Sequence, residues 1–173
     1  MDNSNISLPI KDLERRFRNV ILRLPAIAGN EVVNFALDNW KRQAWLGDTA
    51  EPWKPRKNPT KWGQTPKRNG RAILIDSGRL RRSVRVIRTT PDMAVVGTDV
   101  PYARAHNEGV RLGVIQTVTP FQRKMKTGKT VNVKGHIRRI NQNIPRRQFL
   151  GNSQYLTNKL RRAAMAEFMK ALR

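Results

Sequence analysis

The sequence predicts an α+β fold in which helices pack on an antiparallel sheet of about four strands. Apolar residues recur at helical spacing near both ends of the 173-residue chain. The middle of the chain instead alternates apolar and polar residues over short runs that are bounded by Gly, Pro, Asp and Asn. The predicted order is helix, helix, extended arm, β-hairpin, short helix, long β-hairpin and helix.

Residues 1–46 predict two antiparallel helices that form a helical hairpin. Ser7 is placed to cap the first helix, Pro25 to end it, and Asn30 to cap the second after a short connection. Such apolar stripes serve core packing or, alternatively, docking of a partner into a groove. The stripes are Leu13, Phe17, Val20, Ile21 and Leu24 in the first helix and Val33, Leu37, Trp40 and Ala44 in the second.

Residues 47–73 predict an extended, basic arm rich in proline and tryptophan. Periodicity is absent, and from residue 52 to residue 75 there are seven basic residues and no acidic one. Trp53 and Trp62 are candidate partner contacts, because tryptophan is enriched at interface hot spots, and aromatic rings among cations can also stack on unpaired bases. The alternative is a loop whose tryptophans pack on their own domain.

Residues 74–173 predict a compact core that begins with a turn and a hairpin. Asp76-Ser77-Gly78 is a breaker cluster whose Asp and Ser are available as helix caps. Strands are expected over 83–88 and 93–97, with turn residues between them. A helical turn then follows Pro101 and is closed by Gly109.

A second, longer hairpin is expected from strands at 114–119 and 130–140, joined by a flexible basic tip. Val131, Val133 and Ile137 are predicted to face the core, and Gly135 to mark a bulge or bend. Such a hairpin projects from the sheet toward a lumen or a neighbour, or is simply solvated. The candidate DNA-facing or lumen-facing residues are Arg123, Lys124, Lys126, Lys129, Lys134, Arg138 and Arg139.

The last helix is predicted to start after Ser153, which can cap it, and to pack on the sheet. Before it, Pro145 fixes the approach, Phe149 and Leu150 offer apolar anchors, and Gly151 ends the turn. Arg146 and Arg147 are expected to be exposed and to contact a polyanion or protein partner.

Three segments in this order resemble the tail-completion, or virion morphogenesis, proteins of tailed bacteriophages. They are a Ser/Thr-Gly-x-Leu-x-x-Ser turn at 77–83, a Tyr-Ala-x-x-His-x-x-Gly segment at 102–109 and a Pro-x-Arg-x-Phe-Leu-Gly turn at 145–151. The resemblance spans roughly residues 74–172 and does not reach the N-terminal 70 residues. The residues that carry it are expected to be structural: Ser77, Gly78, Leu80, Tyr102, His106, Gly109, Pro145, Phe149, Leu150 and Gly151.

Composition limits the partner class. The net charge is +23, from 35 Lys/Arg against 12 Asp/Glu, and residues 109–166 hold thirteen basic residues and no acid. Such a surface repels itself unless a polyanion or an acidic protein is near, and nucleic acid is the commonest such partner. Cysteine is absent, which excludes disulfides and thiolate metal sites. No signal peptide or membrane span is recognised, so the chain is expected to be made in the host cytoplasm.

No catalytic constellation is expected. His106 and Glu108 form a His-x-Glu pair, but zinc deaminases need two cysteine ligands and this chain has none. His136 is the only other histidine, so a three-histidine zinc site is impossible. His106 is therefore interpreted as a structural residue, the alternative being a nuclease that uses His106 and Glu108. No cofactor or metal is predicted.

The function predicted from the resemblance is that of a structural virion protein, a tail-completion or neck component. The resemblance implies a homo-oligomeric ring at the head–tail junction, between the head connector or stopper and the tail terminator or tail tube, with DNA passing through it. Six-fold symmetry is usual in phage tails, and twelve-fold symmetry follows if the ring matches the portal. The alternative is a monomeric basic nucleic-acid-binding protein of nucleoid-like or ribosome-associated type.

Overall fold

The computed structural model describes residues 10–55 and 72–173. These residues form helices and antiparallel strand pairs, which confirms the α+β class. The division of the chain into 1–46, 47–73 and 74–173 stays a prediction. The elements in chain order are α1 Ile10–Arg42, β1 Ala44–Leu46, β2 Ala50–Pro52, α2 Arg79–Ser83, β3 Arg85–Thr89, β4 Ala94–Gly97, α3 Ala103–Glu108, β5 Val110–Val118, β6 Phe121–Lys124, β7 Thr130–Val133, β8 His136–Ile144 and α4 Gln154–Ala171.

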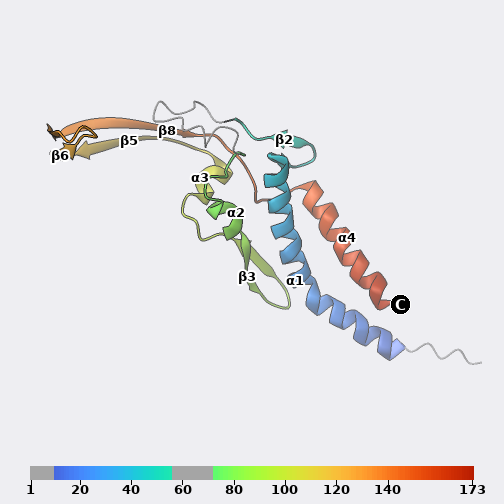
Figure 1. The fold of residues 1–173 in the computed structure, drawn as a ribbon. Coiled ribbons are helices and arrows are strands. Elements are labelled where there is room, and N and C mark those ends of the chain that lie inside the picture. The colour runs from blue at the N-terminus through green and yellow to red at the C-terminus, as the bar shows by residue number, and fades with distance from the viewer. Residues whose placement is uncertain (1–9, 56–71) are drawn as a thin grey trace, which may run out of the picture.

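The predicted N-terminal helical hairpin is wrong, because α1 is one helix of 33 residues that runs through Pro25. Asn30 lies inside α1 and caps nothing, and the predicted cap Ser7 lies outside the described residues. Proline has no N–H for the helical ladder and normally kinks a helix rather than always ending it. Figure 1 shows that the two halves of α1 run in different directions. Pro25 therefore bends α1 without ending it, and the packing of both halves keeps the bent helix intact.

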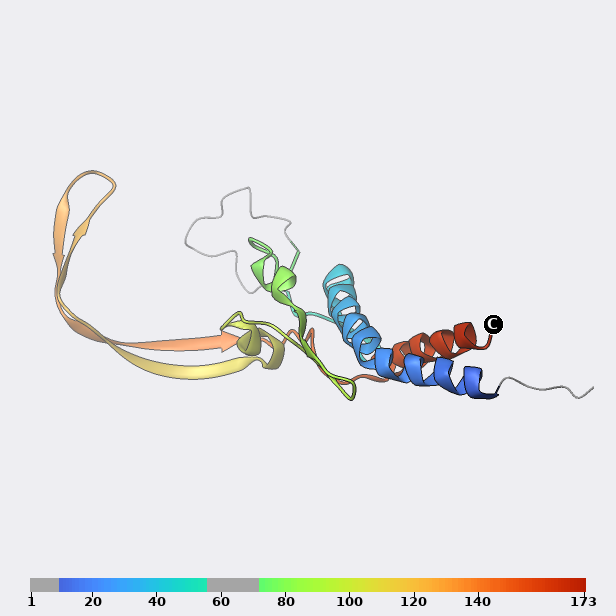
Figure 2. The same cartoon turned by 90° about the horizontal axis from the view of Figure 1, so that it is seen from below.

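The predicted packing of the C-terminal helix on the sheet is also wrong, because α4 lies along α1 (Figures 1 and 2). Phe17 of α1 and Phe168 of α4 meet edge to face, with ring centroids 5.6 Å apart. The predicted cap is confirmed: the Ser153 hydroxyl accepts a hydrogen bond from the Leu156 amide at 3.0 Å. Helix α4 covers only one side of α1. Ile21, which belongs to the predicted apolar stripe of the first helix, is therefore 54% exposed.

A part-buried ion pair fixes the two helices in register. The Lys159 ammonium of α4 lies 3.0 Å from Asp38 and 3.4 Å from Glu31 of α1. Burial alone lowers the pKa of Lys159, but the hydrogen bond to Asp38 and the charges of both carboxylates outweigh it and raise that pKa.

The strands form four separate two-stranded pairs rather than one sheet of about four strands. The predicted first hairpin is confirmed as β3–β4, with a register irregularity at Ile87. This hairpin packs on α1 at Gly29, where an added Cβ would lie only 3.0 Å from Val86 and 3.1 Å from Ala94. Helix α1 covers one face of the hairpin, and no other described strand pairs with its edges, so the larger sheet is absent from the described residues.

The core surrounds Trp40 of α1, which is 2% exposed. The Phe149 ring lies 4.6 Å from the Trp40 ring, and Trp53 meets Trp40 edge to face at 6.0 Å. Leu80, the apolar residue of the first family-like segment, is 4% exposed in the same cluster. Of the stripe predicted for the second helix, Leu37 is instead 39% exposed, because the covering elements approach α1 from the side of Phe35, Ala36 and Asn39.

Residues 110–144 form the longest feature of the fold, which we call the ribbon. It consists of the paired strands β5 and β8, continued by β6 and β7, and it projects away from the helices (Figures 1 and 2). The ribbon bends where Gly135 faces the Pro120 ring, at 3.1 Å from the position of an added Cβ.

The prediction that Val131, Val133 and Ile137 face the core is wrong. Val131 is 40% exposed and Ile137 is 71% exposed, and Val133 is half-buried on the ribbon. A two-stranded ribbon that leaves the body has no layer above or below it, so the alternation of its side chains does not distinguish a core face from a solvent face.

One helix among the described residues, α1, contains an 18-residue stretch that is long and apolar enough to cross a membrane by length and composition alone. Here α1 packs along α4 and the β3–β4 hairpin. Core helices pass the same test, so the absence of a membrane partner stays a prediction.

Candidate functional site

Both ends of the ribbon are fixed to the core by the segment that follows it. β5 begins directly after α3, and β8 ends directly before Pro145. The Asn107 side-chain oxygen accepts hydrogen bonds from the amides of Phe149 and Leu150 at 2.9 and 3.0 Å, and its amide group donates to the Leu150 carbonyl at 3.1 Å. The His106 carbonyl accepts from the Arg147 amide at 2.8 Å. We call Asn107 and its bonds to residues 149 and 150 the clasp.

A second buried amide holds the same segment to α1. Asn39 is fully buried, donates to the Phe149 carbonyl at 3.3 Å and accepts from the Leu46 amide at 2.8 Å. Phe149 is thus bonded through both its N–H and its C=O while its ring fills the core. A buried amide side chain with satisfied donors and acceptors specifies one arrangement, because any other leaves polar groups unpaired.

Gly109 brings the two ends of the ribbon close together. Its φ of +78° is in the left-handed region, and it ends α3 by donating to the Ala105 carbonyl, as predicted. An added Cβ would lie 2.8 Å from the Arg146 amide nitrogen, a contact that a side chain cannot make. Gly78 likewise has a φ of +75° and occupies the N-cap position of α2 that was predicted for Asp76 or Ser77, while the Ser77 hydroxyl still accepts from the amide of Arg79 in the first turn.

Two of the four candidate partner contacts face inward. Arg147 is 7% exposed and donates to the carbonyls of Lys54 at 2.9 Å and Pro55 at 3.2 Å, so it is not free for a polyanion. Trp53 is 5% exposed and donates to the Gln148 carbonyl at 2.9 Å, which matches the alternative that it packs on its own domain. Arg146 is exposed and remains a candidate. Trp62 lies outside the described residues.

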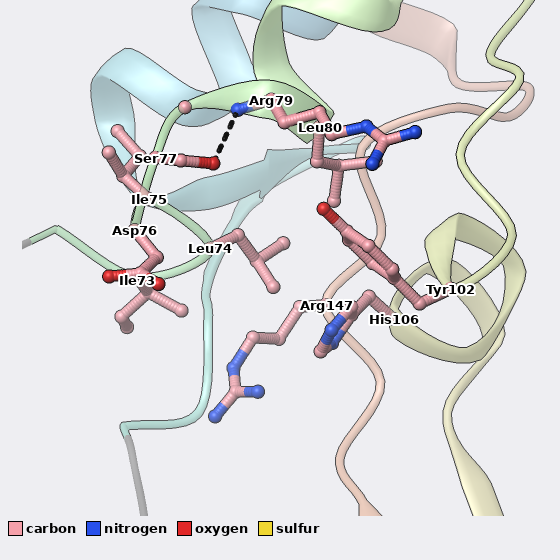
Figure 3. A pocket seen from close by; sticks show the side chains of 11 residues that line it. Ile73, Leu74, Ile75, Asp76, Ser77, Arg79, Leu80, Tyr102, His106 and Arg147 are labelled. Atoms are coloured by element: carbon pink, nitrogen blue, oxygen red, sulfur yellow. Dashed lines mark hydrogen bonds between the residues drawn. The ribbon is translucent and has the colours of Figure 1, made fainter.

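Family-like residues gather around one cavity of about 480 Å³ (Figure 3). Ser77, Leu80, Tyr102 and His106 line it, although they come from two separate segments, and the Ser77 hydroxyl accepts from the Arg79 amide at 3.3 Å. The rings of Tyr102 and His106 meet edge to face with centroids 5.9 Å apart. The remaining lining consists of the aliphatic residues 73–75, the charged residues Asp76, Arg79 and Arg147, and Gly78.

The surroundings of His106 fit the predicted structural role. Its Nδ1 atom is buried and has no hydrogen-bond partner among the described residues. Burial, and secondarily the positive charge of Arg147, lowers the pKa of His106 and favours the neutral ring. Glu108 is turned outward and pairs with Arg104 at 3.0 Å, so the two residues do not converge on one reactive point. Within residues 10–55 and 72–173, no three His, Asp or Glu side chains cluster as metal ligands would.

The ribbon carries a dense run of unpaired positive charge. It contains eight basic residues and no acidic one. Within the described residues, none of these eight forms an ion pair, although Arg138 donates to Gln116 at 2.7 and 2.9 Å. All seven sequence-predicted cations are exposed: Arg123, Lys124, Lys126, Lys129, Lys134, Arg138 and Arg139.

The register gathers aliphatic side chains on one face of the ribbon near its base and leaves a mixed face opposite. Residues directly opposite each other in an antiparallel pair lie on the same face. Pairing of Val110 with Ile144 and of Val114 with Ile140 therefore gathers aliphatic side chains on one face near the base. The apolar face comprises Val110, Leu112, Val114, Ile140 and Ile144, and Gln116 and Arg138 follow on it toward the tip. The opposite face is mixed and carries Arg111, Ile115, Thr117, Ile137, Arg139, Asn141 and Asn143.

Sequence reasoning missed the amides that organise the site. Asn107 stands in the middle of the His-Asn-Glu string that drew attention for catalysis, and Asn39 lies beside the tryptophan of a predicted apolar stripe. Gln43 is a third case: its side chain bonds both the amide and the carbonyl of Ile73, 30 residues away. A lone Asn in a helix signals nothing by itself, and only the fold shows what it bonds.

Comparison with known proteins agrees with the family-like segments. No curated protein and no solved structure matches the chain. A family model described as the phage virion morphogenesis family matches residues 41–168. That span includes the ribbon, the clasp, the cavity residues and most of α4. The chain therefore belongs to the phage virion morphogenesis family and has a structural or assembly role in the virion.

Proposed function

We propose that this chain is a tail-completion or neck protein, assembled as a ring at the head–tail junction through which DNA passes. The observation that carries the proposal is the ribbon, which projects from the helices with eight basic residues and no acid. In a chain of a virion assembly family, a basic projection of this kind suits a passage through which a polyanion moves. Phosphate contacts are independent of sequence, as transit of a whole genome requires.

The proposed partners follow from that position. Copies of the chain form the ring, six by analogy with phage tails or twelve if the ring matches the portal. The head connector or stopper lies on one side, and the tail terminator or tail tube on the other. The proposed ring is not an enzyme: positive potential and shape supply its whole action, as the buried Nδ1 atom of His106 and the outward Glu108 support.

Deletion of the gene from the source phage tests the proposal directly. The expected product is DNA-filled heads and separate tails that do not join, and the wild-type chain supplied from a plasmid restores joined particles. The His106→Ala variant is the control for catalysis. If the chain were a nuclease that uses His106, this variant would lose function even when it is incorporated into particles. Complete particles that form without this chain, or purified virions that lack it, would refute the neck assignment.

The second candidate is a monomeric nucleic-acid-binding protein, which the exposed ribbon cations also favour. The two differ in mass and in salt dependence. Light scattering on the purified chain reports a ring or a monomer, and DNA affinity across a salt series reports how many phosphates one copy contacts. A monomer that binds DNA tightly and with a steep salt slope favours the second candidate.

A further inference from the structure

Among the described residues of its own chain, no segment covers the apolar face of the ribbon around Leu112 and Val114. Leu112 is 53% exposed and Val114 is 43% exposed. An isolated two-stranded ribbon is marginally stable in water, and long exposed strands that carry aliphatic side chains are pairing hazards. Nine paired residues per strand make this a long exposure, so a covering partner is required.

Charge narrows the identity of that partner. The apolar face lies at the base of the ribbon, and seven of the eight basic residues lie beyond it, toward the tip. DNA suits the tip, but an aliphatic face gains nothing from phosphate. Arg138 lies on the same face as Ile140, two positions closer to the tip. The base of the ribbon therefore suits an apolar protein surface with an acidic residue at one end, which can pair with Arg138.

The chain itself carries such a surface on the outer face of its β3–β4 hairpin. Ile87 is 59% exposed, Met93 is 48% exposed and Val95 is 39% exposed. Asp92, in the turn beside Met93, is exposed and forms no ion pair within the described residues. The side chains of Val86 and Ala94 point the other way, against Gly29 of α1.

The exposed methionines of α4 do not offer the same combination. Met165 and Met169 of α4 are exposed, but the neighbouring Glu167 is already paired with Lys170. On the β3–β4 hairpin, Arg85 is paired with Asp99 at 3.6 Å, and Arg88 stands opposite Val95. Asp92, the acidic residue of the hairpin without an ion pair among the described residues, therefore lies at the turn. A docked ribbon would place Arg138 near this turn.

We propose that the apolar face of the ribbon docks on the outer face of the β3–β4 hairpin of a second copy of this chain. Leu112, Val114 and Ile140 cover Ile87 and Val95, and Arg138 approaches Asp92 of the second copy. The basic tip then extends past the neighbour and stays free for DNA. The inference rests on the proposed function for its ring context, but the contact itself can be tested without the phage.

Two adjacent residues provide a matched pair for the test. Val114 lies on the apolar face, and Ile115 lies on the opposite face and is 72% exposed. Both are exposed enough to accept aspartate without loss of the fold, which circular dichroism checks. The expected result of sedimentation or light scattering is that Val114→Asp weakens self-association by at least about ten-fold, whereas Ile115→Asp leaves it within about two-fold. Equal effects of the two variants, or a wild-type chain that stays monomeric, overturn the proposal.

Cysteine cross-linking tests the identity of the docking surface. The chain has no cysteine, so introduced thiols are unique. A mixture of the Val114→Cys and Val95→Cys variants, treated with a short bismaleimide, is expected to give a cross-linked dimer, and a mixture of Ile115→Cys with Val95→Cys is expected to give at least about ten-fold less. Absence of that selectivity overturns the contact. A chain found in the virion neck whose Val114→Asp variant still self-associates refutes the contact alone, whereas selective cross-linking by a chain absent from virions refutes only the neck function.

Discussion

The clasp and the ribbon are neighbours in the sequence, yet they depend on different physics. Asn107 closes its bonds to residues 149 and 150 inside the protein, and the Phe149 ring is 1% exposed. Three residues after Asn107, the chain enters β5 of the ribbon, whose side chains lie almost entirely in solvent. The clasp is therefore complete in one copy of the chain, whereas the ribbon exposes the side chains that the proposed partner would cover.

This difference teaches how a small assembly protein divides its sequence. Burial and satisfied hydrogen bonds at the clasp hold the two ends of the ribbon at a fixed position on the core. The ribbon itself contributes little to the stability of one copy, because it buries little. Its residues are free to meet other molecules, and changes there are expected to alter assembly more than folding.

The largest expected contrast is between two phenylalanines. Phe149→Ala removes a ring packed against Trp40 at the centre of the core and should lower the free energy of unfolding by about 3–5 kcal/mol. Phe121→Ala, at a ribbon residue that is 48% exposed, should lower it by less than about 1 kcal/mol. Urea unfolding followed by tryptophan fluorescence measures both. Similar losses in the two variants would show that the ribbon is part of the folding unit.

The clasp itself should give the next largest effect. Asn107→Ala leaves the amides of Phe149 and Leu150 without their acceptor and should cost about 1–3 kcal/mol. Asn141→Ala, an exposed position on β8, is the control and should change stability by no more than about 0.5 kcal/mol. Hydrogen exchange localises the effect, since the amides of 149 and 150 should exchange faster only in the Asn107 variant. Unchanged protection there would contradict the clasp.

The contrast also explains which features could be predicted from sequence. The β3–β4 hairpin, α3 with its closing Gly109 and the Ser153 cap were predictable because turn and cap chemistry is local. Pro25 misled the prediction because whether a proline ends or bends a helix depends on what packs on either side of it. The inward side chains of Trp53 and Arg147 depend on partners about 95 residues away, which no local pattern reports.

The ribbon was predicted as a hairpin, with its basic residues assigned to the surface. Its faces were misassigned because apolar alternation signals a core face only if a second layer exists. The apolar alternation of Val110, Leu112 and Val114 is better explained by a partner than by a core. The structural role of the family-like residues of the cavity stays a prediction, and their convergence around Tyr102 and His106 could be seen only in the fold.

A pH titration tests the structural role of His106 with a smaller effect. Because its pKa is lowered in the folded protein, the unfolded chain binds the proton more readily. Stability is therefore fully present above the ordinary histidine pKa of about 6.5 and is lost as the pH falls below it. Thermal unfolding of the wild type between pH 7.5 and pH 5 should show this loss, and His106→Gln should remove it.

The other histidine provides the matched control for the titration. His136 is exposed on β8, so His136→Gln should retain the loss of stability at low pH. If the loss persists in His106→Gln and disappears in His136→Gln, burial of the His106 ring is not its cause.

The smallest effect on folding should come with a clear effect on DNA binding. Lys124, Lys126 and Lys129 surround the ribbon tip, are exposed and form no ion pair within the described part of the chain. Replacing all three with glutamine should change the free energy of unfolding by less than about 0.5 kcal/mol. If each lysine contacts one phosphate, the slope of log K against log salt should become shallower by about 3.

A control of equal charge separates the tip from net charge. Arg161, Arg162 and Arg173 are exposed on or next to α4, on the body of the protein. Glutamine at these three positions also removes three positive charges, but it should leave the salt slope nearly unchanged, because bound DNA is expected to contact the ribbon rather than α4. Equal changes in slope for the two triple variants would mean that DNA responds to total charge alone, and the ribbon would lose its assignment as the DNA-facing element while its docking face would be unaffected.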